Sequence, residues 1–71
     1  MADDYHDYVR TALPALRRLA YVLCQDGHRA DDLVQSALVK LYLSWDRIRT
    51  NRDAYARTVL VRVFLSERRG G

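Results

Sequence analysis

The fold is decided by the stretch ADDLVQSALVKLYLSWDRI, which covers residues 30–48. Its apolar residues recur at the i, i+3, i+4, i+7 spacing that places side chains on one face of an α-helix. We therefore expect a helix from about Arg29 to Trp45, with Asp31 and Asp32 in its first turn, where negative charge suits the helix dipole. Its predicted buried face consists of Ala30, Leu33, Val34, Ala37, Leu38, Leu41, Tyr42 and Trp45.

The segments on either side of this helix also predict helices. Residues 2–11 predict a short N-terminal helix, which Pro14 separates from the next one because proline lacks the amide hydrogen of a continuing helix. Gly27 is the expected left-handed cap after residue 24. Thr50 or Asn51 could cap a last helix over residues 53–69, whose apolar stripe is Ala56, Val59, Leu60, Val63 and Phe64. The sequence thus predicts an all-α fold, a small helical bundle of three principal helices plus a short N-terminal helix.

Composition limits the chain to one small globular domain. Of its 71 residues, 49% are hydrophobic and 30% are charged, which is ordinary for a domain with a core. The single cysteine, Cys24, excludes an internal disulfide, and we expect it to be a buried apolar thiol. No apolar run is long enough to span a membrane and no secretory signal is visible, so we expect a cytoplasmic protein.

Charge is distributed unevenly along the chain. Residues 1–32 carry four arginines against six aspartates, a net charge of −2, whereas residues 33–71 carry eight basic residues against three acidic ones, a net charge of +5. This asymmetry favours a nucleic-acid surface in the second half. Eleven arginines against one lysine also fit the coding bias of a high-GC genome, so a merely solvated basic face stays open.

No pattern in the chain predicts catalysis. Ser36, Ser44 and Ser66 lie in helical runs without a neighbouring base or a glycine elbow. His6 and His28 lack the paired spacing of a metal-binding helix, and there is no glycine-rich phosphate loop. We therefore expect no enzyme, no metal site and no cofactor.

Three motifs in order carry a family resemblance. DLVQ at residues 32–35 is followed by an aliphatic helix ending in Trp45, and then by DAYARTVLVRVFLSERRG at residues 53–70. Together they resemble region 2 of the extracytoplasmic-function sigma factors of bacterial RNA polymerase, most closely the actinobacterial branch. The resemblance runs from about Tyr8 to Arg69. It implies that residues 1–71 form one region 2 domain, either isolated or a fragment that lacks the −35-binding region 4 domain.

The resemblance also implies two binding surfaces. The first would dock on the clamp helices of the polymerase β′ subunit, as a helix face presented to a partner, and consists of Asp32, Leu33, Gln35, Ser36, Val39 and Lys40. The second would capture a flipped base of the promoter −10 element on the non-template strand and grip its backbone. It consists of Arg47, Arg49, Thr50, Asn51, Arg52, Tyr55, Arg57, Thr58 and Arg62.

Alternatives accompany these assignments. Each arginine could belong to a solvated helix face, and Trp45 and Tyr55 could be core residues instead of stacking platforms. Many family members carry Asn where Arg62 stands, and a bulky cation there favours phosphate contact over base reading.

The expected function is recognition and melting of the −10 element when docked on RNA polymerase core. The expected partners are that core and promoter DNA, with an anti-sigma factor that could mask both surfaces, and no membrane. The alternative is a helical protein–protein interaction module, an adaptor or anti-sigma-binding domain, without DNA binding. A dimer through Leu43, Val61 or Leu65 is also open.

Overall fold

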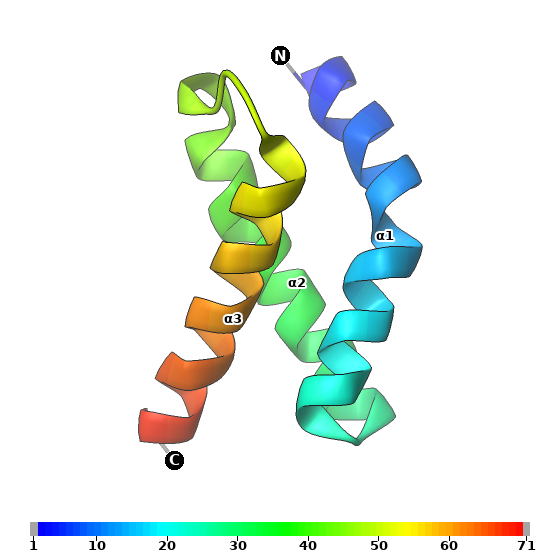
Figure 1. Ribbon diagram of the computed structural model, residues 1–71, viewed down its shortest axis with the longest axis vertical. Coiled ribbons are helices and arrows are strands. Elements are labelled where there is room, and N and C mark those ends of the chain that lie inside the picture. The colour runs from blue at the N-terminus through cyan, green and yellow to red at the C-terminus, as the bar shows by residue number, and fades with distance from the viewer. Residues whose placement is uncertain (1, 71) are drawn as a thin grey trace.

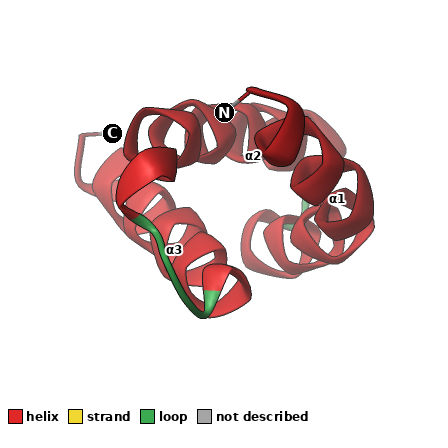
Figure 2. Cartoon of the chain, turned by 90° about the horizontal axis from the view of Figure 1, so that it is seen from above, coloured by secondary structure: helices red, strands yellow, loops and turns green. Residues whose placement is uncertain are grey.

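The computed structural model describes the backbone of residues 2–70 and the side chains of residues 4–68. Within this range the chain forms α1 (Ala2–Cys24), α2 (Gly27–Ser44), the 3₁₀ turn η1 (Trp45–Arg47) and α3 (Arg52–Gly70). The helix α2 runs antiparallel to both α1 and α3 (Figure 1) and packs against each of them more extensively than α1 and α3 pack together. Seen from above, α1 and α3 lie on two sides of α2 (Figure 2). The predicted all-α bundle is confirmed.

The predicted separate N-terminal helix is wrong, because α1 continues through Pro14. Pro14 is exposed, so its ring faces solvent and the helix loses one backbone hydrogen bond, at a cost of about 3 kcal/mol. Tyr5 and Leu16, which lie on either side of Pro14, are 8% and 4% exposed in the same core. A continuous helix keeps both of them buried, and this burial offsets the cost of the proline.

The turn between α1 and α2 also differs from the prediction. Gln25, with φ 56°, adopts the left-handed conformation expected of Gly27. Asp26 is the N-cap, and its Oδ1 accepts hydrogen bonds from the amides of His28 at 2.9 Å and Arg29 at 3.2 Å. The Arg29 amide contributes most to lowering the pKa of this carboxyl. Because α2 begins at Gly27, the aspartates at 31 and 32 lie beyond its first turn, contrary to the prediction.

The first residue of α3 decides between Thr50 and Asn51, the two predicted caps of this helix. The helix begins at Arg52, so the N-cap position belongs to Asn51, whose backbone is left-handed with φ 54°. The carbonyl of Asn51 accepts the first helical bond, from the amide of Tyr55 at 3.1 Å. Asparagine tolerates the left-handed region better than most residues, which explains its place at this corner.

Most of the predicted stripe of α2 forms the core. Leu33 and Leu41 are 0% and 1% exposed, and Leu60 of α3 is 0% exposed. Tyr42 departs from the prediction, because it is 52% exposed. Its ring packs edge-to-face with that of Tyr5, with ring centres 5.0 Å apart, at the margin of the core. The buried residues are Tyr5, Leu16, Ala20, Ala30, Leu33, Val34, Ala37, Leu41, Trp45, Ile48, Ala56, Leu60 and Val63.

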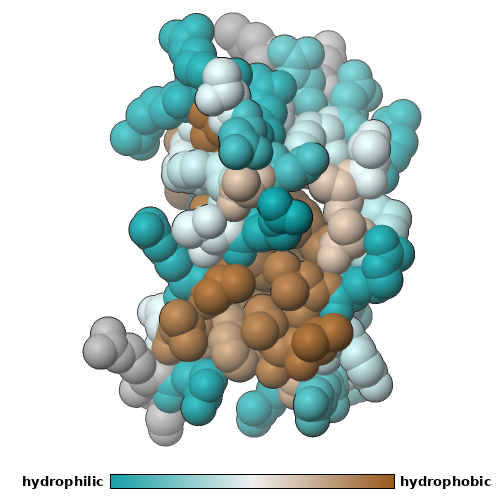
Figure 3. Space-filling model, in the orientation of Figure 1, coloured by the Kyte–Doolittle hydropathy of each residue, from teal (hydrophilic) through white to brown (hydrophobic). Residues whose placement is uncertain are grey.

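Apolar atoms gather on one part of the surface. They lie over the region between α1 and α3, at the end away from the loop that joins α2 to α3 (Figure 3). Cys24 and Phe64 are half-buried near this end, and desolvation by burial raises the pKa of the Cys24 thiol. Among the described residues, no helix is both long and apolar enough to cross a membrane.

Candidate nucleic-acid interface

The connection between α2 and α3 contains two buried residues, and the exposed side chains around them form its rim. Trp45 and Ile48 are only 4% and 6% exposed, so they fix the connection to the core. The amide of Ile48 donates to the carbonyl of Trp45 at 3.1 Å, which closes η1. We call residues 46–51 the corner loop. Its other side chains, Asp46, Arg47, Arg49, Thr50 and Asn51, are exposed.

A hollow of about 330 Å³ lies beside the corner loop. Its walls come from the end of α2, the loop and the first turn of α3, and consist of Ser44, Arg47, Ile48, Arg49, Thr50 and Tyr55. The volume is at the lower end of the range of small-molecule pockets. The walls combine two guanidinium groups, three hydroxyls and the aromatic ring of Tyr55, and groups of these kinds can hold an unstacked base and its phosphates.

A second groove, of about 610 Å³, lies between α2 and α3 and shares Ser44 and Tyr55 with the hollow. Lys40 comes from its α2 wall, and Arg62 comes from its α3 wall. Ser36 also lines this groove. The groove therefore brings together residues that the sequence assigned to two different partners.

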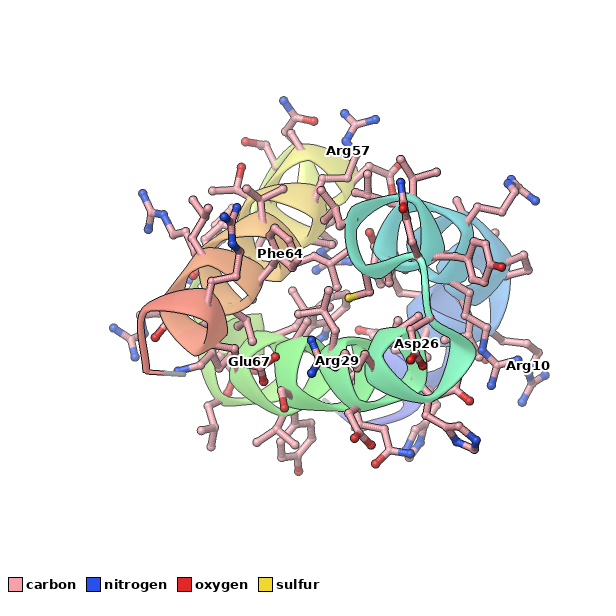
Figure 4. The ribbon with its side chains drawn as sticks, turned by 90° about the horizontal axis from the view of Figure 1, so that it is seen from below. Arg10, Asp26, Arg29, Arg57, Phe64 and Glu67 are labelled. Carbon is pink, nitrogen blue, oxygen red and sulfur yellow. The ribbon has the colours of Figure 1, made fainter. Side chains whose placement is uncertain are left out.

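Three of the residues predicted to bind DNA lie apart from this surface. Arg57 is on the side of α3 turned away from α2 (Figure 4), and its charge acts on Tyr8 of α1. Thr58 is exposed but lines neither the hollow nor the groove. Arg52 is half-buried, with its guanidinium carbon 4.2 Å from the centre of the Trp45 ring.

The two aromatic residues of the site have different roles. Trp45 is a core residue, packed against Tyr5 and Tyr8 with ring centres 5.5 Å and 5.3 Å apart. Tyr55 is 39% exposed and lines both the hollow and the groove. Of these two residues, Tyr55 is therefore the one whose ring is accessible at the hollow.

The predicted protein-binding face of α2 is largely exposed. Asp32, Gln35, Val39 and Lys40 are exposed and Ser36 is half-buried. Leu33 is 0% exposed, so it offers no surface to a partner and belongs to the core.

From the sequence, Leu43 was considered only as a dimer contact and was not placed on this face. Leu43 is 71% exposed and follows Asp32, Gln35 and Val39 at helical spacing, and Tyr42 beside it is 52% exposed. We call Asp32, Gln35, Val39 and Leu43 the α2 ridge. Large apolar side chains left exposed on a helix are typical of a partner-binding surface. The signal was present in the sequence, because the 32, 35, 39, 43 spacing continues the same face by one more turn.

The described residues contain no group of histidine, cysteine or acidic side chains that could hold a metal ion. Burial is the main cause that raises the pKa of Tyr8, followed by its hydrogen bond to Asp53. The charged side chains of the corner loop are Arg47, Arg49 and Asp46, and all three are exposed.

Comparison with known proteins identifies the family of the chain. The family model described as Sigma-70 region 2 matches residues 8–71. The chain is 45% identical over 60 residues to the RNA polymerase sigma-E factor of Streptomyces avermitilis, an alignment that covers 82% of this chain and 34% of that protein. The sigma-E factor of Streptomyces coelicolor is 42% identical over 60 residues, with the same coverage.

A more distant relative matches a longer part of the chain. The ECF RNA polymerase sigma factor EcfG of Rhodopseudomonas palustris is 34% identical over 71 residues, covering 97% of this chain and 39% of that protein. No solved structure matches the chain at a comparable level. The chain thus spans little more than a third of the length of these relatives. It belongs to the sigma-70 region 2 family, as the region 2 domain of an extracytoplasmic-function sigma factor.

Proposed function

We propose that this domain works in transcription initiation by docking on the β′ clamp helices of RNA polymerase while it recognises and melts the promoter −10 element. The observation that carries the proposal is the hollow at the corner loop, where Arg47, Arg49 and Thr50 surround a space beside Tyr55. Membership of the sigma-70 region 2 family gives this hollow its expected ligand, a base of the non-template strand.

Capture of a flipped base would favour melting, because it stabilises the strand-separated form of the promoter duplex. Extruding a base from a duplex costs a few kcal/mol, and the hollow offers stacking on Tyr55 and hydrogen bonding from Thr50 in return. Arg47 and Arg49 are exposed on its walls and can hold the adjacent phosphates. Asn51, exposed at the end of the corner loop, is placed to read a base edge.

The groove between α2 and α3 extends this surface along the DNA. Arg62 lies on its α3 wall, where a cation suits a phosphate better than a base edge. Thr58 and Arg57 lie outside the groove and hollow, so we propose no contact between them and the captured strand.

The α2 ridge is the proposed docking surface for the clamp helices. Asp32 and Gln35 provide polar groups, and the 59% and 71% exposed Val39 and Leu43 provide apolar area, which together suit one helix laid against another. Docking also strengthens DNA binding, because a tethered domain meets the promoter at a high effective concentration. The alternative, a protein-binding module without DNA binding, shares the ridge but leaves the basic rim of the corner loop without a role.

Single-stranded DNA binding separates these two functions. Fluorescence anisotropy of a labelled random-sequence single strand is measured against the wild-type chain and an Arg47→Gln, Arg49→Gln double variant. Because each phosphate contact adds about 0.7 to the slope of log K against log salt for a single strand, the double variant should lower the slope by about 1.4. The matched control, Arg17→Gln with Arg18→Gln, removes the same charge from exposed positions of α1 and should leave the slope unchanged.

Two results would count against the proposal. Equal losses in both double variants would indicate attraction by overall charge. Absence of binding by the wild-type chain at high micromolar concentration would favour the protein-binding module.

A further inference from the structure

The corner loop has little backbone structure of its own. Among the described residues, the backbone hydrogen bonds outside the helices that involve this connection are those of Ile48 with Trp45 and Tyr55 with Asn51, both 3.1 Å long. An exposed loop of this kind is usually mobile unless side chains hold it. A preformed hollow therefore needs contacts from the neighbouring elements.

Arg52 supplies two of these contacts from the first residue of α3. Its guanidinium carbon lies 4.2 Å from the centre of the Trp45 ring, which is a cation–π distance. Its Nε donates a hydrogen bond to the carbonyl oxygen of Ile48, at 3.4 Å. One half-buried side chain thus connects the residue before the loop with a residue inside it.

The helix α1 supplies the other contacts. The hydroxyl of Tyr8 donates to Oδ1 of Asp53, at 2.8 Å, and the Tyr8 ring packs on Trp45. The hydroxyl of Tyr5 donates to the carbonyl oxygen of Leu38, also at 2.8 Å, and its ring meets Trp45 edge-on. The two tyrosines therefore fix Trp45 and the first turn of α3 to the same helix.

We propose that Tyr8, Arg52 and Asp53 form a brace that holds the corner loop in its DNA-binding shape, with Arg52 a positioning residue and not a phosphate contact. The inference rests on the proposed DNA-binding function, which supplies its biological role. It assigns Arg52 a role different from that of Arg47 and Arg49, whose side chains are exposed on the rim. The three arginines are neighbours in sequence, but only Arg52 is turned onto a buried ring.

Salt dependence of single-strand binding distinguishes positioning from phosphate contact. Arg52→Gln should weaken binding of a random-sequence single strand roughly two- to tenfold, as expected for losing one or two modest interactions, while the slope against log salt stays at the wild-type value. Arg47→Gln should lower that slope by about 0.7. An equal fall in slope for Arg52→Gln would overturn the proposal and make Arg52 a phosphate contact.

Trp45 gives a readout that does not depend on DNA. It is the single tryptophan of the chain and is 4% exposed, so quenching of its fluorescence by acrylamide reports whether the loop has opened. Tyr8→Phe, Arg52→Gln and Asp53→Ala should each increase quenching. Asp53→Asn should restore wild-type quenching, because its amide oxygen can still accept the Tyr8 hydroxyl. Tyr21→Phe, which removes the same hydroxyl from a 57% exposed tyrosine of α1, is the matched control.

These readouts separate the brace from the proposed function and from the fold. If the wild-type chain fails to bind single strands, the proposed function fails, and the quenching series still decides whether the brace exists. Unchanged quenching in all three variants would overturn the brace. Helical content measured by circular dichroism must match the wild type in each variant, and a loss of helix in Tyr8→Phe alone leaves Arg52→Gln and Asp53→Ala to decide.

Discussion

Leu33 and Leu43 are the same residue type on the same helix, and they allow a direct test of which side of α2 is structural. Leu33 belongs to the DLVQ motif and is 0% exposed, whereas Leu43 is 71% exposed on the α2 ridge. Each is replaced by alanine. Alanine is the best helix former, so neither change disrupts α2 through helix propensity.

The expected cost follows from burial. Removing a fully buried leucine side chain loses its transfer free energy and leaves a cavity, which together amount to about 2.7–5 kcal/mol. A domain of 71 residues has a total stability of roughly 4–11 kcal/mol. Leu33→Ala should therefore remove about half of the free energy of unfolding. Leu43→Ala should change it by less than about 0.5 kcal/mol, because its side chain is already in water.

Urea unfolding followed by far-ultraviolet circular dichroism measures both changes, since the described chain is almost entirely helical. In thermal melts, Leu33→Ala should lower the midpoint by at least about 10 °C for a domain of this size. A loss below about 1 kcal/mol for Leu33→Ala, or an equal loss for Leu43→Ala, would refute the assignment of these two faces of α2.

Three further predictions concern α1 and its turn. Pro14→Ala should raise the free energy of unfolding by about 1–2 kcal/mol in urea melts, because it restores a helical hydrogen bond at an exposed position while freeing the unfolded chain somewhat. Asp26→Asn should destabilise the fold at neutral pH. Because folding lowers the pKa of Asp26, the stability that comes from its charge is complete above the usual pKa of 3.8 and is lost as pH falls through the lowered value. The melting curves of the wild type and the variant, measured at successive pH values, should therefore converge in strong acid. Burial raises the pKa of Cys24, and its thiol should therefore react more slowly with iodoacetamide near neutral pH than the cysteine of an unstructured peptide, as mass spectrometry can measure.

Hydrophobic periodicity was enough to predict the three principal helices and most of their buried faces, because each helix buries one apolar stripe. It failed where a local rule competed with tertiary packing. Pro14 satisfies the local rule for a helix break, yet the buried Tyr5 and Leu16 on either side of it require one continuous helix. At the turn after Cys24, the side chain of Asp26 captures two amides and starts α2 earlier than the apolar pattern indicated.

The candidate site was predictable in composition but not in arrangement. Family resemblance and charge predicted that the corner loop would carry exposed arginines, and Arg47 and Arg49 agree. The inward turn of Arg52 depends on a ring that enters the core from η1 and is covered by α1. A residue pattern within one helix cannot predict such a contact, because it joins residues of α1, η1 and α3.

The proposed function depends above all on docking of the α2 ridge on RNA polymerase. It is tested most directly by titrating the chain with a purified fragment containing the β′ clamp helices, using the wild type, an Asp32→Ala, Gln35→Ala double variant, and an Arg17→Ala, Arg18→Ala control on α1. We expect saturable binding that is weakened at least about tenfold in the ridge variant, which corresponds to a loss of roughly 1.4 kcal/mol or more of binding free energy, and that is unchanged in the control. Absence of saturable binding at high micromolar concentration, or equal loss in both variants, would contradict it.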